Sequence, residues 1–253
     1  MSYFVRSGSI RGLPQLLDEF DVALAPLLQS FDLPLDLCNE DDTLVEIGTV
    51  SALLERAAEL CQCPHFGLLM GGIQQPNVYR GIVGLIMQSS PDLESAHNEF
   101  VRHSNMVSQG VNWNLETEGD YTRLILTFEK DVPPISTQAT ALAVTQASKI
   151  WRLLSSNQWR PQEVSFHYDS PPETWSYRQL FGSNIRFNAE FDGFTFPSAY
   201  LSLPVHSKND LLRETLSRYA EAQSSDAAPD FTNQVKQIIR QLLPSGSATM
   251  ENV

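Results

Sequence analysis

The stretch VNWNLETEGDYTRLILTFE, residues 111–129, decides the fold because its secondary structure can be read without ambiguity. Apolar residues alternate with polar ones on both sides of a Glu-Gly-Asp turn: Val111, Trp113 and Leu115 before it, and Tyr121, Leu124, Leu126 and Phe128 after it. A period of two on both sides of a short turn is typical of a β-hairpin. The sequence therefore predicts an antiparallel pair of strands here.

Apolar residues at helical spacing flank this hairpin in both directions. They predict helices over residues 13–31 (interrupted at Pro26), 51–61, 136–154 and 211–222. Ser90 as N-cap and Pro91 at the first helical position are expected to begin another helix that runs to about residue 108. Short apolar runs at residues 66–70 and 81–88 fit a helix or a strand equally well.

The second half of the chain adds shorter elements. Strands are predicted at residues 164–168, 185–187 and 194–196, and a short helix over residues 173–181 is expected to end at Gly182. Helix and strand patterns are mixed rather than strictly alternating. We therefore predict an α+β fold in which N-terminal helices pack beside a largely antiparallel sheet of about four to six strands and further helices.

Composition restricts the class of protein. The chain has 253 residues, 42% of them hydrophobic, so it can bury a substantial core. Its formal net charge of −13 predicts that these residues alone do not bind DNA appreciably, since Lys and Arg carry that affinity. The sequence shows no secretory signal and no apolar run of membrane-spanning length, so we expect a cytoplasmic protein without a membrane partner.

Few residues are candidates for catalysis or metal binding. The three cysteines, Cys38, Cys61 and Cys63, are expected to be core or surface thiols in a reducing compartment, because a second pair of metal ligands is missing. His97 and His103 are six residues apart, which is not the spacing at which two imidazoles of one helix share a metal. We expect no metal site.

The sequence also gives little support for nucleotide binding or for a catalytic nucleophile. Gly81-Ile-Val-Gly lacks a following phosphate-binding Lys-Ser/Thr. His167 with Asp169 could be a base with its orienting acid, but no serine or cysteine can be assigned as the partner from sequence. We expect that the chain binds no cofactor and has no enzymatic activity. The alternative is that it is a stand-alone small-molecule-binding enzyme of unknown reaction.

The C-terminal stretch predicts the start of a second domain. Residues 231–243 place five apolar side chains on one helix face: Val235, Ile238, Ile239, Leu242 and Leu243. Pro-Ser-Gly at 244–246 then breaks the helix, and Ser247 begins another that the sequence does not complete. This order is typical of the opening of a helix-turn-helix, whose base-reading helix comes later.

We therefore expect residues 1–222 to form an effector-binding or dimerisation domain, 223–230 a linker, and 231–253 the incomplete start of a helix-turn-helix DNA-binding domain. The alternative for the last segment is a C-terminal helix that packs on the first domain before a disordered tail.

Several segments, in order along the chain, carry a family resemblance. They are Phe66-Gly-Leu-Leu-Met-Gly, Gly84-Leu-Ile-Met-Gln-Ser-Ser-Pro-Asp-Leu-Glu-Ser-Ala, Asn157-Gln-Trp-Arg-Pro-Gln-Glu-Val, Tyr177-Arg-Gln-Leu-Phe-Gly and Phe194-Thr-Phe-Pro-Ser-Ala-Tyr-Leu. Over roughly residues 12–220 the chain resembles the arabinose-binding N-terminal domain of AraC-family regulators of the ornithine-utilisation type. The stretch from Gln234 through Pro-Ser-Gly to Thr-Met-Glu-Asn-Val resembles the beginning of their DNA-binding domain.

The resemblance implies a ligand-sensing or dimerising domain of a bacterial transcription regulator. Its implied partners are a small-molecule effector, promoter DNA contacted through the missing C-terminal domain rather than through this fragment, and a second copy of the chain in a homodimer. The word "arabinose" in the family description does not specify a sugar as the ligand.

We predict that the effector site is a mostly apolar pocket between the hairpin and the helices, which would accept a small metabolite or a fatty-acid-like molecule. The ligand-binding residues expected to line this one space are Met87, His103, Met106, Trp113, Phe128, His167 and Tyr168.

Overall fold

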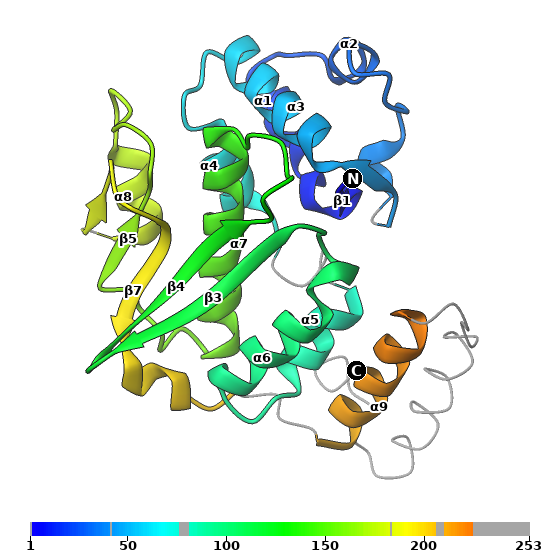
Figure 1. The fold of residues 1–253 in the computed structure, drawn as a ribbon. Coiled ribbons are helices and arrows are strands. Elements are labelled where there is room, and N and C mark those ends of the chain that lie inside the picture. Colours follow the sequence, from blue (N-terminus) through cyan, green and yellow to red (C-terminus); the bar gives the residue numbers. More distant parts are fainter. Residues whose placement is uncertain (1, 41, 76–80, 183, 206–209, 225–253) are drawn as a thin grey trace.

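The structure, a computed structural model, describes residues 2–40, 42–75, 81–182, 184–205 and 210–224. The predicted start of a helix-turn-helix domain at 231–253 and most of the predicted linker lie outside these residues. The described chain has the predicted α+β architecture, with helices packed around and beside a sheet (Figure 1).

The main sheet has five strands in the order β3-β4-β7-β5-β6. The predicted hairpin is confirmed as β3 (Val111–Glu118) and β4 (Tyr121–Phe128), paired antiparallel. β7 (Asp192–Pro197) lies antiparallel to β4 and to β5 (Glu163–Ser165), and β6 (Ile185–Arg186) is parallel to β5. The sheet is therefore largely antiparallel, as predicted.

Helices α7 (Thr137–Leu154) and α8 (Trp175–Phe181) cover one face of this sheet. The buried aromatic rings on this face form what we call the aromatic core, with Trp151, Trp159, Phe194 and Phe196 at its centre. The Trp159 ring meets the Phe194 ring edge-on at 5.3 Å between centroids and the Phe196 ring at 5.7 Å. Edge-to-face contacts of this kind favour one ring arrangement, so the strands are held in a defined position relative to α7.

The described residues up to 75 form a helical half. A two-stranded ribbon, β1 (Phe4–Arg6) and β2 (Leu44–Glu46), lies beside two 3-10 turns, η1 (Ser7–Ile10) and η2 (Leu37–Asn39), and four helices: α1 (Leu13–Glu19), α2 (Leu24–Gln29), α3 (Ile47–Leu60) and α4 (Phe66–Ile73). Their shared interior is mostly leucine, valine and isoleucine, and we call it the aliphatic core.

Helix α7 belongs to both cores, since Leu142 packs in the aliphatic core and Val144 in the aromatic core. Helix α4 crosses α7 at close range. A Cβ atom on Gly67 would lie 1.9 Å from the carbonyl oxygen of Gln138, and one on Gly71 would lie 2.6 Å from Thr145 Cβ. Glycine is therefore required at Gly67, where the two backbones approach each other directly.

The remaining helices lie at the end of the molecule where the hairpin begins (Figure 1). They are α5 (Gly81–Gln88), α6 (Leu93–His103) with the turn η3 (Ser104–Met106), and α9 (Asp210–Ser224), and the turn η4 (Ser198–Ser202) follows β7. A small buried cluster, Ile86, Leu216 and Ala220, holds α9 against α5.

Two predicted helix boundaries are wrong. Pro26 does not separate two helices: it is the third residue of α2, where its missing N–H leaves no bond unmade, and the chain turns earlier at Asp21, whose φ is 55°. Ser90 does not begin α6 either. Its Oγ donates to Ile86 O at the end of α5, and Asp92 caps α6 by accepting from Ser95 N at 2.8 Å.

Four further segments either settle an ambiguous prediction or are shorter than predicted. The two ambiguous apolar runs are helices, α4 and α5. Helix α6 ends at His103 rather than near residue 108, because the turn η3 follows it. Strand β5 ends before residue 168 because the His167 backbone N–H donates to the side chain of Asp192 instead of to a neighbouring strand.

Candidate functional site

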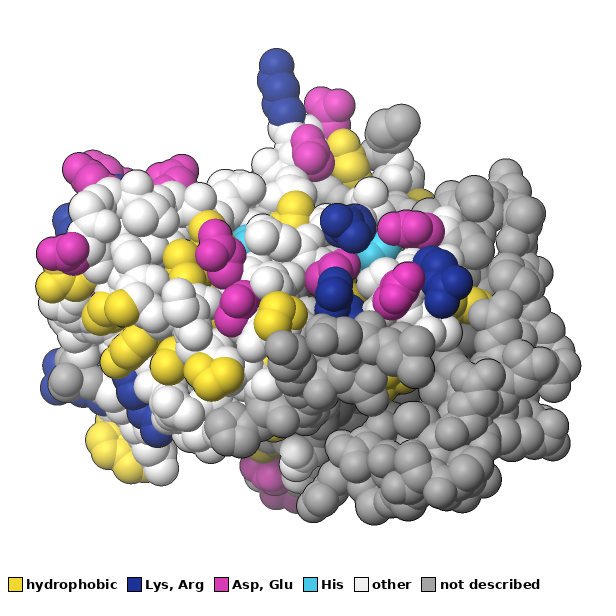
Figure 2. All heavy atoms as spheres, turned by 90° about the horizontal axis from the view of Figure 1, so that it is seen from below, with side chains coloured by type: hydrophobic (Ala, Val, Ile, Leu, Met, Phe, Trp, Pro, Cys, Tyr) yellow, Lys and Arg dark blue, Asp and Glu magenta, His cyan; other side chains and the backbone are white. Residues whose placement is uncertain are grey.

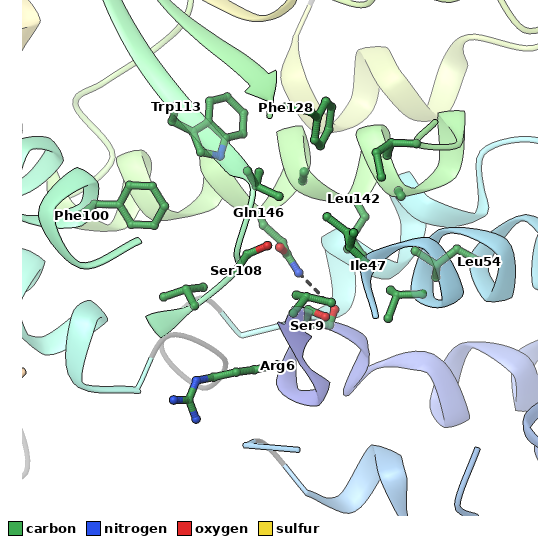
Figure 3. Close-up of a pocket in the computed structure, with 17 residues that line it drawn as sticks. Arg6, Ser9, Ile47, Leu54, Phe100, Ser108, Trp113, Phe128, Leu142 and Gln146 are labelled. Atoms are coloured by element: carbon green, nitrogen blue, oxygen red, sulfur yellow. Dashed lines mark hydrogen bonds between the residues drawn. The ribbon is translucent and has the colours of Figure 1, made fainter. Parts of the chain in front are cut away.

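A cavity of about 100 Å³ lies where the helical half meets the sheet (Figure 3). We call it the seam cavity. Its walls are mostly apolar and come from η1, β1, α3, α6, α7 and the hairpin: Val5, Arg6, Ser9, Ile47, Val50, Leu54, Phe100, Val107, Ser108, Val111, Trp113, Phe128, Ile135, Ala139, Leu142, Ala143 and Gln146.

Small side chains on α7 leave this space open. Ala139 and Ala143 are one helical turn apart and both line the seam cavity, between the bulky aromatic wall of Trp113 and Phe128 and the aliphatic wall of α3. Because close packing fills protein interiors almost completely, a cavity of this size at the contact of two cores is a feature that a ligand can exploit.

A buried amide network forms the polar end of the seam cavity. The Gln146 side-chain nitrogen donates to Gln74 Oε1 at 2.6 Å and to the Ser9 carbonyl oxygen at 3.3 Å, and the Gln74 side-chain nitrogen donates to the same carbonyl at 2.7 Å. Both glutamines are buried. Ser9 lines the cavity, and its Oγ atom is buried with no hydrogen-bond partner among the described residues.

Arg6 is the one ionisable residue among the described residues that line the seam cavity, and its charge is already engaged. Its Nε donates to the carbonyl oxygen of Met106 and its Nη1 pairs with the carboxylate of Asp42. These two bonds hold the guanidinium away from the apolar walls, as Figure 3 also shows.

Three of the predicted ligand-binding residues lie at or beside this cavity. Trp113 and Phe128 line it. Met87 does not, but with Trp113 it lines a second, smaller cavity of about 20 Å³ next to His97. Phe100 and Trp113 border both cavities and so separate them.

His97, whose spacing from His103 argued against a shared metal, is a buried residue. Burial lowers the pKa of its imidazole to about 4, against the opposing effect of a hydrogen bond with the Trp113 backbone. The ring is therefore neutral near pH 7. It lies 6.0 Å from the Trp151 ring between centroids, as part of the aromatic core.

Two other predicted site residues, His103 and Met106, lie near α9. Met106 packs against the cluster that holds α9. His103 is buried, and its Nε2 lies 3.7 Å from a Glu99 oxygen; burial lowers the pKa of His103 and the Glu99 charge opposes this shift. Glu99 itself accepts a 3.1 Å bond from Arg213 of α9. This contact joins α6 to α9.

The last two predicted site residues lie at the far end of β5. His167 Nδ1 lies 2.7 Å from Asp192 Oδ2, so Asp192 rather than Asp169 is the acid beside it. The Tyr168 hydroxyl contacts the Tyr177 hydroxyl at 3.2 Å, and burial raises the pKa of Tyr168. The structure thus does not bring the seven residues into one space; ligand contact by any of them stays a prediction.

A nucleophile beside His167 or a group of metal ligands would favour catalysis by the described part of the chain. Within it, no serine or cysteine is hydrogen-bonded to the His167 ring, and no three potential metal ligands form a group. The three cysteines are buried, and burial raises the pKa of Cys38 to about 11, which makes it a poor nucleophile. No described helix is long and apolar enough to cross a membrane.

Sequence reasoning missed Ser9, Gln74 and Gln146, the members of the hydrogen-bond network at the polar end of the seam cavity. They come from three segments far apart in the chain, so no local motif connects them. One signal was available: Gln146 stands on the apolar face of α7, between Leu142 and Ile150, where a buried amide needs partners.

Comparisons with known proteins agree with this architecture. The family model described as the arabinose-binding domain of AraC transcription regulators, N-terminal, matches residues 22–205. The HTH-type transcriptional regulator VirS of Mycobacterium tuberculosis, in strains CDC 1551 / Oshkosh and H37Rv, is 22% identical over 251 residues, which cover 98% of this chain and 74% of VirS.

A solved structure supports the fold. The crystal structure of transcriptional regulator CdpR from Pseudomonas aeruginosa aligns with a TM-score of 0.56 at 14% identity, over 96% of this chain and 80% of that chain. This likeness concerns the fold alone. The family match covers most of the chain, and with it the chain is assigned: it belongs to the AraC-family transcription regulators that carry the arabinose-binding type of N-terminal domain.

Proposed function

We propose that this chain is the regulatory N-terminal region of a bacterial DNA-binding transcription regulator that works in the cytoplasm and senses a small-molecule effector in the seam cavity. The observation that carries the proposal is the cavity itself, an apolar space between two cores that ends at Ser9 and at the buried Gln146, which Gln74 holds in place from behind. Apolar walls with a few fixed polar groups are the usual composition of small-molecule sites.

Helix α6 supports a route from the cavity to the end of the described chain. Its Phe100 lines the seam cavity, while Glu99 binds Arg213 of α9. A ligand that favours one position of Phe100 would therefore shift the position of α6, and with it the docking of α9. Helix α9 leads into the expected linker, residues 223–230, which precedes the segment that we expect to begin the DNA-binding domain.

The distribution of charge supports DNA binding by the second expected domain and not by the first. On the face of the molecule in Figure 2, basic side chains of the described residues are interspersed with acidic ones and form no continuous basic surface. With a net charge of −13, we expect this chain to give no specific complex in an electrophoretic shift assay. We propose that promoter DNA is bound by a C-terminal domain, in a homodimer.

A thermal-shift screen of amino acids, sugars, fatty acids and short alcohols tests the sensor role, because a ligand stabilises the state that it binds. Ala143→Leu fills the seam cavity and should abolish the shift given by any hit. The matched control is Ala52→Leu, on the exposed face of α3, which should leave that shift unchanged. A hit whose shift survives Ala143→Leu would mean that the effector binds elsewhere.

A further inference from the structure

We propose that the seam cavity selects an uncharged amphipathic molecule with a short, slender apolar chain, whose hydroxyl or carbonyl group bonds Ser9 and whose chain ends against Phe100. This inference rests on the proposed sensor function and names the chemical class of its effector. Neither the family description nor the names of the relatives specifies that class.

The charges around the cavity argue against an ionised ligand. Among the described lining residues, Arg6 alone can carry a charge, and the Asp42 carboxylate and the Met106 carbonyl already engage it. A buried carboxylate or ammonium is costly unless a partner compensates it. The guanidinium points away from the apolar walls (Figure 3), so an anionic ligand lying along them would lack a counter-charge, whereas a neutral ligand needs none.

The polar end of the cavity suits a hydroxyl or carbonyl head group. The Ser9 Oγ atom is buried without a partner in the described part of the chain, and a hydroxyl can both donate and accept. Beside it, Gln146 and Gln74 bond each other and the Ser9 carbonyl, which holds η1 in place. One neutral polar group on the ligand is enough to satisfy the serine.

The size and the opposite wall restrict the apolar part. A dry cavity of about 150 Å³ can hold benzene, so a cavity of about 100 Å³ fits a chain of roughly four to six heavy atoms. Phe100 and Trp113 close this end and separate it from the smaller cavity of about 20 Å³ beside His97. Phe100 is therefore the residue that sets the accepted chain length.

The test compares two homologous series on the intact chain at pH 7.5: 1-alkanols from propanol to decanol and the sodium alkanoates of the same lengths. Thermal shift and calorimetric titration measure binding. We expect the alkanols to bind with an optimum length near butanol or pentanol, as the cavity volume predicts, and the alkanoates to bind at least about tenfold more weakly. Ser9→Ala should weaken alkanol binding about three- to tenfold, the usual effect of one hydrogen bond.

Phe100→Ala joins the two cavities and should move the optimum to a longer alkanol. Phe100→Leu, a smaller change, serves if Phe100→Ala does not fold, and should give a shift in the same direction. An unchanged optimum in a folded variant would overturn the role of Phe100. Ala143→Leu should abolish alkanol binding and Ala52→Leu should not, which separates the cavity from general effects of alcohol on the protein.

The results distinguish a wrong assignment of the ligand class from a wrong assignment of the effector site. If alkanoates bind as tightly as alkanols and Ala143→Leu abolishes both, the neutral class is wrong and the site stands. If no alkanol binds, the class is wrong as well. If hits from the wider screen bind regardless of Ala143→Leu, the seam cavity is not the effector site and the proposed sensor function fails with it.

Discussion

The two cores that meet at the seam cavity are built from different side chains. Rings dominate the aromatic core, where Trp159 touches both Phe194 and Phe196, while leucine and valine fill the aliphatic core around α3. Aromatic contacts have preferred geometries, whereas aliphatic cores tolerate repacking at small cost. We expect the sheet side of the cavity to be the fixed wall and the helical side to be the wall that adapts to a ligand.

Trp159→Ala gives the largest expected effect. This ring is fully buried at the centre of the aromatic core, so its removal should lower the free energy of unfolding by about 3–5 kcal/mol in urea denaturation. Trp159→Phe should cost clearly less, because Trp159 Nε1 is buried without a partner among the described residues and its loss leaves no bond unmade. Equal losses for the two variants would mean that the aromatic core needs the full shape of the indole, and that another aromatic ring cannot replace it.

Leucine deletions should then separate the interior of the aliphatic core from its cavity wall. Leu28 and Leu54 are both fully buried, but Leu54 lines the seam cavity and so has fewer neighbours to lose. In the same denaturation experiment we expect a cost of about 3 kcal/mol for Leu28→Ala and about 2 kcal/mol for Leu54→Ala. A larger cost for Leu54→Ala than for Leu28→Ala would contradict the expectation that the helical wall of the cavity adapts to a ligand.

Acid should destabilise the part of the molecule built around the main sheet and the aromatic core, which we call the sheet half, through His97. Its pKa is lowered to about 4 in the folded protein from 6.5, so the unfolded chain binds the proton first as the pH falls. The stabilisation is complete above pH 6.5 and is lost progressively between pH 6.5 and 4. At pH 5 the loss amounts to about 2 kcal/mol.

Tryptophan fluorescence can follow this loss, since the four tryptophans at 113, 151, 159 and 175 all lie outside the helical half. His97→Gln should flatten the pH profile of stability in this window. His103→Gln is the control for the other buried imidazole, and a profile that only this second variant flattens would assign the effect to α9.

The smallest expected effect concerns α9. The question is whether this helix unfolds together with the sheet half or unfolds locally on its own. Glu99→Gln weakens the bond to Arg213, whose side chain is about one-third exposed, so we expect a loss of only about 1 kcal/mol. Hydrogen exchange should become faster in α9 and stay unchanged in α7. Arg102→Gln, which alters an exposed neighbour of the same carboxylate, is the control. Faster exchange in both helices would make α9 part of the sheet half.

Residues with a strong local pattern were predicted well from the sequence. The alternation in residues 111–129 identified the hairpin, and Ser136 was correctly placed at the start of α7, where it caps the helix. The start of α6 was not, because Ser90, Pro91 and Asp92 all suit that position and only the contact of Ser90 with Ile86 decides among them.

The seam cavity could not be predicted in the same way. Its polar end needs Ser9, Gln74 and Gln146 to meet across more than a hundred residues of chain, and periodicity carries no information on such contacts. Trp113 and Phe128, which the hairpin alternation places among the inward-facing side chains, line the cavity, and their contact with a ligand stays a prediction. His167 and Tyr168 lie beyond the end of β5, at another place on the sheet, where they contact Asp192 and Tyr177.

The close crossing of α4 and α7 has a mechanical consequence. Gly67 places the α4 backbone directly against Gln138, and the Gly67 N–H donates to Gln138 Oε1 at 2.9 Å, so α4 cannot slide along α7 without a collision. We therefore expect any relative motion of the two halves to favour rotation about α7 over sliding along it. Spin labels placed on either side of that axis should report opening of the seam as a change of angle, with the separation of α4 from α7 held constant.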